Sequence, residues 1–206
     1  ELTGADVEEV RRGIAADNRI GSAFLFAGLG FGGSCFPKDV LALEALARQV
    51  GYNADILNAV RTINEDQPRR FFKRIKQHFK GSLKGKRFAI WGLAFKPRTD
   101  DIREAPALRL ISLLLEEQAI VSVYDPQAIE NVKKRFGTSL IYGHNEYEIL
   151  EGANALVLCT EWNQFRTPDF QLIKQKMAEP VIFDGRNIYN PKFVTQRGFI
   201  YYGVGR

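Results

Sequence analysis

The chain has 206 residues, with 29 Lys and Arg against 24 Asp and Glu, so its formal net charge is +5. Hydrophobic residues make up 45% and aromatic residues 12%, enough apolar surface to offset chain entropy and exclude a disordered chain. No run of about 18 apolar residues occurs, so the sequence predicts no membrane span. The polar start, residues 1–6, does not resemble a signal peptide. The length is typical of one large or two small domains.

The two cysteines, Cys35 and Cys159, lie far apart in the sequence. They are too few for a disulfide scaffold or a cysteine-rich zinc site, so we expect a reducing, cytoplasmic location and no metal. A pI near 9.2 raises the possibility of nucleic-acid binding. However, the basic stretches at 73–76 and 84–87 are short and the other basic residues are interspersed with acids. Solvated helix faces are the favoured interpretation, and we expect no nucleic-acid partner.

Residues 1–80 show the spacing of helices, interrupted by one glycine-rich loop. Val7, Val10 and Ile14 form a helical stripe within residues 6–16. Further helices are predicted over 41–50 and over 53–79, the latter with a bend near Pro68. Glycines at 81 and 85 close this region. We therefore expect a boundary between a first part, 1–80, and a second part, 81–206.

The second part alternates apolar runs with helical patterns. Strands are predicted over 88–91, 119–124, 155–159 and 181–183, and more weakly over 199–201, with a helix over 106–117. This alternation predicts an α/β fold with a parallel sheet. Because the runs are almost continuously apolar, both faces of the sheet should be covered.

A glycine-rich stretch from Gly28 to Gly33 matches the pattern G-x-G-x-x-G. No strand is predicted before it and Pro37 follows shortly, so it lacks the context of a dinucleotide fingerprint. Glycines also allow backbone amides to approach a ligand closely. For Cys35, which follows the glycines, two interpretations are open. It is a small buried side chain, or it is a nucleophile whose thiolate is favoured by a helix start after Pro37 and by the nearby Lys38.

A second polar cluster, residues 92–104, follows the first predicted strand of the second part. Ligands of open α/β sheets bind at this carboxyl edge, so Lys96 and Arg103 are either phosphate contacts or members of local ion pairs in a solvated loop. Asp125 ends the next strand, where a ribose-binding acid would lie, but the first turn contains only Gly92. A full dinucleotide site is therefore not expected. Arg186 follows the fourth strand and should reach the same edge.

The stretch from Gly30 to Asp39 resembles the active-site signature of the UDP-glucose/GDP-mannose dehydrogenase family. Residues 3–7, 17–21, 93–97 with 101–104, and 160–162 with 183–186 resemble the same family, in the same order along the whole chain. The resemblance implies a central helical dimerisation segment that carries the cysteine loop, followed by a Rossmann-like nucleotide-binding domain that takes UDP.

The resemblance also implies an activity. Members on the UDP-glucose side of the family oxidise UDP-glucose to UDP-glucuronate by two hydride transfers to NAD. Cys35 would hold the sugar as a thiohemiacetal and then as a thioester, which water hydrolyses. Asp39 would assist that water or the proton transfers. Lys38 and Arg103 would contact NAD.

The remaining implied roles concern the substrate and the subunit partner. Arg19 would reach the substrate of the neighbouring subunit in a homodimer formed through the central helices. Lys96 and Arg186 would be the cationic contacts of UDP, together with Phe95. The loop that lines the sugar nucleotide would consist of Phe24, Leu25, Phe26, Ala27, Gly28 and Gly32.

One departure from the family pattern stands out. Family members begin with an NAD-binding domain that has a true G-x-G-x-x-G motif, which these 206 residues do not contain, so we expect the chain to bind a UDP-sugar but to be inactive alone. Two alternatives are kept. One is a sister dehydrogenase that acts on another nucleotide sugar, such as GDP-mannose. The other is a module that only binds UDP and dimerises.

Overall fold

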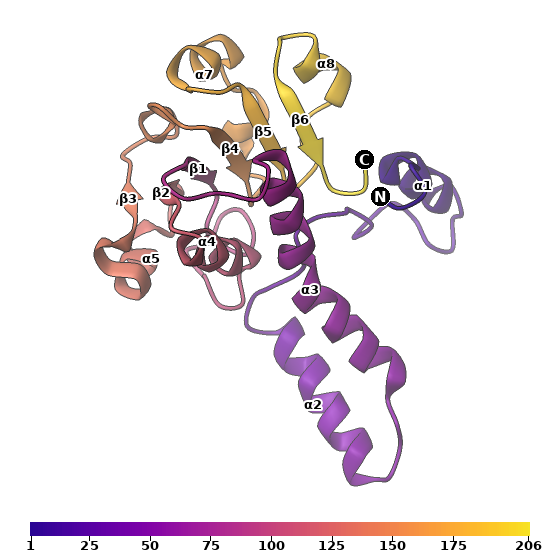
Figure 1. Cartoon of the computed structure of the whole chain (residues 1–206). Coiled ribbons are helices and arrows are strands. Elements are labelled where there is room, and N and C mark those ends of the chain that lie inside the picture. Colours follow the sequence, from indigo (N-terminus) through magenta and orange to yellow (C-terminus); the bar gives the residue numbers. More distant parts are fainter.

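The computed structural model describes all residues 1–206 and contains one six-stranded sheet in which every pairing is parallel (Figure 1). The strand order is β3-β2-β1-β4-β5-β6, the order of a doubly wound Rossmann sheet. The expected α/β fold is confirmed. The strands are β1 (Arg87–Trp91), β2 (Ile120–Tyr124), β3 (Ile141–Tyr142), β4 (Ala155–Leu158), β5 (Val181–Asp184) and β6 (Ile200–Gly203). The helices are α1 (Val7–Ala15), α2 (Phe36–Gln49), α3 (Asp55–His78), α4 (Pro106–Glu116), α5 (Ile129–Phe136), α6 (Asn163–Arg166), α7 (Phe170–Lys176) and α8 (Pro191–Thr195).

Two clusters of buried side chains fill the space around the sheet. One contains Phe88 of β1 together with Leu108 of α4 and Ile75 of α3. The other contains Trp91 of β1, whose ring stacks on that of Phe165 at 4.9 Å between centroids. Strands covered in this way need apolar residues at successive positions, which explains the continuous apolar runs of β1, β4 and β5.

Helices α2 and α3 form a hairpin that projects away from the sheet (Figure 1). Only the base of this hairpin enters the core, through Phe71, Phe72 and Ile75 of α3. We call α2 together with residues 55–67 of α3 the stalk. Its outer part carries exposed apolar side chains such as Leu43, Leu46, Ile56 and Ile63. The stalk therefore leaves many of its apolar side chains in solvent, whereas the central strands β1, β4 and β5 bury theirs.

The first helix lies beside the end of the chain (Figure 1). Asp6 caps α1 by accepting a hydrogen bond from the amide of Glu8 at 2.9 Å. The amide of Val7 donates to the carbonyl of Gly205 at 2.9 Å. None of the helices combines the length and the apolar character that a bilayer crossing needs.

The helices agree with the sequence prediction in most respects, and one strand does not. Helix α2 begins at Phe36, earlier than its apolar pattern from residue 41 but next to the start expected at Pro37, which lies in the first turn, where no backbone N–H is needed. Helix α3 runs through Pro68 as one helix, as predicted. The short strand β3 was not predicted, because its two residues, half-buried or exposed, carry almost no hydrophobic pattern.

Candidate functional site

The glycine-rich loop, residues 28–33, lies against the carboxyl edge of the sheet. At its start, the amide of Leu29 donates to the carbonyl of Gly185, just after β5, at 3.1 Å. At its end, the amide of Gly33 donates to the carbonyl of Arg103 in the loop after β1, at 2.8 Å. Leu29 itself is buried in the core. The loop therefore bridges two turns of the sheet edge, and no strand precedes it, as the sequence indicated.

Two of its glycines are required by close packing. A Cβ at Gly32 would collide with the carbonyl of Glu104. Gly33 has φ +91° and a Cβ there would lie 2.8 Å from the Phe95 ring, so both the backbone conformation and the space exclude a larger residue. These two glycines are therefore needed for close packing of the loop against other residues of the same chain.

Helix α3 holds the same loop from the other side. The Asn64 amide group accepts from the Phe31 amide at 2.7 Å and donates to the Phe31 carbonyl at 3.0 Å. One turn further, Gln67 Nε2 donates to the carbonyl of Gly28 at 3.4 Å. These two side chains, three residues apart on one helix face, fix the backbone of the loop to the base of the stalk.

Cys35 follows this loop and is exposed, at the N-cap position of α2. The interpretation of Cys35 as a small buried side chain is therefore wrong. Its sulfur lies 3.7 Å from the Ser34 hydroxyl. Lys38 and Asp39 lie in the first turn of α2, are both largely exposed, and pair at 3.5 Å between Nζ and Oδ1. An exposed thiol at a helix N-terminus, with a lysine three residues on, has the surroundings of a reactive cysteine.

A cavity of about 510 Å³ is lined by Ser34, Lys38 and Arg103, which flank Cys35 in sequence or in space, although Cys35 itself is not part of the lining. Arg103 pairs with Asp101 at 2.8 Å. The hydrogen bond to Asp101 is the main reason that the pKa of Arg103 is raised, and the charge of Cys35 adds to the same effect. The structure thus brings both predicted NAD contacts, Lys38 and Arg103, to one cavity near Cys35.

Arg186 lies at the other end of the glycine loop. Its Nε is 2.8 Å from Oε2 of Glu161, and its Nη2 donates to Oε1 of Glu161 at 3.0 Å. A Cβ at Gly28 would approach Nη1 of Arg186 to 2.7 Å. Arg186 also lines a second cavity, of about 630 Å³, together with Phe26 and Ala27. The paired guanidinium is held rigidly and still faces a cavity.

The loop after β1 carries the other predicted UDP contacts. Phe95 packs on Gly33, and Lys96 lies over the Phe95 ring with Nζ 5.2 Å from its centroid. Lys96 is exposed. Local ion pairing, the alternative interpretation, applies to Arg103 and Asp101. The hydrogen bond from Arg103 is the chief reason that the pKa of Asp101 is lowered. The same loop therefore contains both a paired cation and an exposed one.

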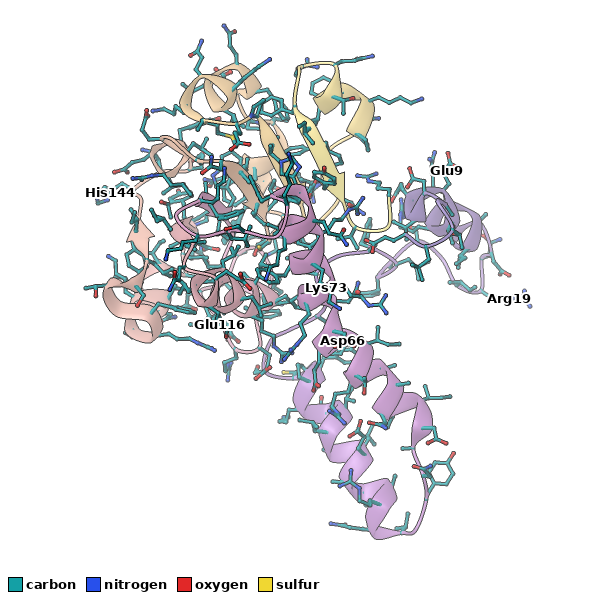
Figure 2. The ribbon with its side chains drawn as sticks, viewed as in Figure 1. Glu9, Arg19, Asp66, Lys73, Glu116 and His144 are labelled. Carbon is teal, nitrogen blue, oxygen red and sulfur yellow. The ribbon has the colours of Figure 1, made fainter.

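Two predicted residues lie apart from this arrangement. Figure 2 shows Arg19 at the outer tip of the segment that follows α1. Its side chain is 88% exposed and pairs with Asp17. Phe24 is 99% exposed with φ +63°, an uncommon backbone conformation for a bulky residue. Leu25 is half-buried. Within one chain, neither Arg19 nor Phe24 is packed against the sheet.

Several polar groups behind the edge are structural. Asp184 accepts hydrogen bonds from the amide of Arg186 and the hydroxyl of Tyr201, both at 2.9 Å, and burial raises its pKa. Burial also raises the pKa of Cys159, which keeps its predicted structural role. His78 ends α3, with Nδ1 3.0 Å from the Tyr202 hydroxyl. His144 is exposed in a loop.

Three positioning residues escaped the sequence prediction: Asn64, Gln67 and Glu161 as the partner of Arg186. Glu161 occurs in one of the motifs, but its pairing across 25 positions leaves no mark in the sequence. For Asn64 and Gln67, the available signal was a polar pair at i and i+3 on an otherwise amphipathic helix. That spacing shows a shared face and not what the face contacts.

The chain was compared with known families and structures. Residues 1–66 match the central domain, and residues 89–191 the UDP binding domain, of the UDP-glucose/GDP-mannose dehydrogenase family. A UDP-glucose 6-dehydrogenase of Pseudomonas aeruginosa is 49% identical over the whole chain, which covers 46% of that protein. One from Rhizobium meliloti is 41% identical, with 47% of its length covered.

The fold agrees with these sequence matches. A UDP-glucose dehydrogenase structure from Pyrobaculum islandicum superposes with a TM-score of 0.87 at 35% identity, covering all of this chain and 45% of that one. The chain thus spans about half the length of the curated relatives it matches. Both of its parts match consecutive domains of one family, so the chain belongs to the UDP-glucose/GDP-mannose dehydrogenase family.

Proposed function

We propose that these residues form the substrate-binding and nucleophilic part of an NAD-dependent UDP-glucose 6-dehydrogenase, which oxidises UDP-glucose to UDP-glucuronate. The observation that carries the proposal is the bridge made by the glycine loop. It links the exposed Cys35 at one end to the paired Arg186 at the other. A sugar nucleotide has the same two-ended chemistry, with a reactive sugar carbon at one end and an anionic diphosphate nearby.

The chemistry proposed for Cys35 follows from its exposure. After the C6 alcohol of the sugar has lost a hydride and a proton, the thiolate adds to the resulting aldehyde and forms a thiohemiacetal. Loss of a second hydride and a proton converts it to a thioester. Water then attacks the thioester carbon, the C–S bond breaks, and the carboxylate and the thiol are released. Asp39, one helical turn after Cys35, would accept a proton from that water.

NAD would accept the two hydrides when bound. The residues present fit part of such a cofactor, because Lys38 and Arg103 place two cations on one cavity. The first turn of the sheet does not fit a dinucleotide, since its amides are occupied by Asp125. The 206 residues alone should therefore bind UDP-glucose without reducing NAD.

The diphosphate is assigned to Lys96 and Arg186. Both follow sheet strands at the same edge, and both have guanidinium or ammonium groups accessible from solvent or from a cavity. A phosphate oxygen could share the Arg186 guanidinium with Glu161, which keeps that side chain in one orientation. The loop that spans residues 24–28 would cover the ligand, with Phe26 and Ala27 already at the cavity wall.

A homodimer through the stalk is part of the proposal. The stalk exposes Leu43, Leu46 and Ile63 by 52%, 56% and 63%, and contiguous apolar surface of this kind marks an association site. Arg19, at the outer tip of its segment, would reach the substrate of the other subunit. A boundary near residues 81–85 would separate this dimerisation part from the nucleotide-binding part.

Two alternatives remain to be separated by experiment. A dehydrogenase of another nucleotide sugar, such as GDP-mannose, would use the same cysteine chemistry. A UDP-binding and dimerisation module would use only the sheet edge and the stalk. A preference for the uracil or the guanine base distinguishes the proposal from the first alternative. The reactivity of Cys35 distinguishes the proposal from the second.

Product formation tests the proposal directly. The native polypeptide that carries these residues should form two NADH per UDP-glucose consumed, and Cys35→Ala should abolish UDP-glucuronate formation while UDP still binds. Cys159→Ala is the matched control and should retain turnover, because that thiol is buried behind the site. Full turnover by Cys35→Ala would refute the proposed mechanism.

A further inference from the structure

The carboxylate of Asp125 is only 2% exposed, yet it has no cationic partner. Its charge is instead surrounded by five hydrogen-bond donors. Oδ2 accepts from the amides of Leu93 at 2.8 Å and Ala94 at 3.2 Å, and from the indole of Trp162 at 3.1 Å. Oδ1 accepts from the amides at 127 and 128, both at 2.9 Å. A buried carboxylate of this kind is an internal anion held by neutral dipoles.

The location of this anion is informative. In a Rossmann sheet, the first turn after β1 directs its backbone amides at a dinucleotide phosphate, and the following helix N-terminus adds its dipole. This chain has the same strand order, and Leu93 and Ala94 are in that first turn. Their amides point at Asp125, the residue directly after the neighbouring strand β2.

Two further features agree with the occupation of this turn by Asp125. Gly92 has φ +90°, and a Cβ there would lie 2.6 Å from the Thr160 nitrogen, so this glycine serves contact with the end of β4. The Thr160 hydroxyl donates to the carbonyl of Ala94 at 2.6 Å. Helix α4 does not start until Pro106, which has no N–H to offer. Thus the amides of the turn are already paired, and the helix begins with a residue that offers no N–H to a phosphate.

We propose that the Asp125 carboxylate is a built-in anion that takes the place of a dinucleotide phosphate at the first turn and positions Lys96 for the diphosphate of a sugar nucleotide. The second part rests on the proposed function. Lys96 lies two residues after Ala94, whose amide and carbonyl are both fixed, the former by Asp125 and the latter by Thr160. Asp125 thereby acts as a positioning residue that also excludes a second dinucleotide from the sheet.

The positioning role is tested by titrating UDP into the 206-residue chain in a calorimeter. Asp125→Asn keeps the volume but places an amide among donors, so UDP should bind about tenfold more weakly. In a Lys96→Ala background, Asp125→Asn should change UDP binding less than twofold, because the side chain that it positions is gone. Asp169→Ala, which removes the cap of α7 far from this turn, should leave UDP binding unchanged.

The internal anion is tested separately with formate. Asp125→Ala leaves five donors unpaired around a space of carboxylate size, so formate should raise its melting temperature by several degrees. Wild type and Asp169→Ala should not respond beyond an ionic-strength control. If Asp125→Ala does not fold, the Asp125→Asn titrations carry the test.

The outcomes separate the two proposals. Unchanged UDP binding by Asp125→Asn, or an equal loss with and without Lys96, would overturn the positioning role. Formate stabilising wild type and Asp125→Ala equally would overturn the internal anion. Failure of wild type to bind UDP would refute the proposed function and, with it, the role in positioning Lys96. A formate response of Asp125→Ala would then still support the internal anion.

Discussion

The sheet and the stalk differ in the burial of their apolar side chains. In β1, β4 and β5 almost every side chain is buried between the two covering clusters, and exposed apolar residues of the sheet are confined to its edge strands, at Ile141 and Ile200. In the stalk, whole helical faces remain exposed, although the helices are as regular as those around the sheet. The apolar faces of the sheet are therefore covered within one chain, whereas the stalk exposes apolar side chains of the kind found in a protein core. The glycine loop with Cys35 lies at the junction of these two regions.

The largest expected effect concerns the stalk. Leu46→Asp places a charge on its apolar face and should dissociate the proposed dimer. Dimerisation would bury only the exposed half of each Leu46 side chain, so the lost burial is roughly 1.5–3 kcal/mol per dimer, and burying an unpaired Asp charge in each copy adds several kcal/mol. Light scattering on a size-exclusion column measures the mass, and Arg48→Asp, two residues along and so on the opposite side of the helix, is the control. A dimer that survives Leu46→Asp would show that the stalk is not the interface.

The next effect belongs to the sheet. Phe183 is fully buried and stacks on Tyr202 at 4.9 Å between ring centroids. Phe183→Ala should lower the free energy of unfolding by about 3–5 kcal/mol, as measured by urea denaturation. Ile63→Ala, in the stalk, should have a much smaller effect when measured at monomer-forming dilution. Equal losses at the two sites would contradict the contrast between the regions.

Ligand binding at the sheet edge is expected to be intermediate. Arg186→Ala removes a charge-assisted contact to the diphosphate and should weaken UDP binding by about 1.5–3 kcal/mol. Arg166, at the end of α6, lines the same cavity, so Arg166→Ala serves as a charge-matched comparison with a smaller loss. Calorimetry gives both values. Indistinguishable losses would mean that Arg186 contributes only to the general positive field.

A smaller effect is expected where the two regions meet. Asn64→Ala removes both hydrogen bonds to Phe31, which together contribute about 1–2 kcal/mol. In Asn64→Ala, the amide of Phe31 should lose protection in hydrogen exchange. Asn58→Ala, farther from the sheet on the same helix, should leave the protection of that amide unchanged. Retained protection of Phe31 in Asn64→Ala would show that α3 does not anchor the glycine loop.

The smallest effect is a pH dependence. The hydrogen bond from Arg103 lowers the pKa of Asp101, so the folded state binds this proton less tightly than the unfolded state. The stabilisation is present above the unfolded pKa, about 3.9, and is lost as the pH falls through the lower folded value. Carboxyl NMR should show the pKa of Asp101 rising in Arg103→Ala. An unchanged pKa would exclude this ion pair in solution.

Much of the fold could be predicted because it has local signals. The apolar runs of β1, β2, β4 and β5 and the stripe of α4 were all evident in the sequence. The apolar pattern alone places the start of α2 at residue 41, whereas Pro37 indicated an earlier start, which the structure has at Phe36. Strand β3 and the path of α3 into the core depend on distant partners, which a single sequence does not reveal.

Some residues of the site could be named from the sequence, whereas the orientation of others could not. Cys35, Lys38 and Asp39 occur in one specific motif, and the structure brings Arg103 to a cavity that Lys38 also lines. Asp125 was interpreted as a possible ribose contact, but the structure directs its carboxylate inward, to Leu93, Ala94 and Trp162. The inward direction depends on the spacing between β1 and β2, which is a tertiary property.

The central claim is that the sheet edge spanned by the glycine loop binds a uridine diphosphate sugar. Its most direct test is calorimetric titration of the 206-residue chain with UDP, UDP-glucose and GDP under identical salt conditions. We predict that UDP and UDP-glucose bind, that GDP binds at least about tenfold more weakly, and that Arg186→Ala removes most of the UDP affinity. Preferential binding of GDP, or no binding of any of the three, would contradict the account.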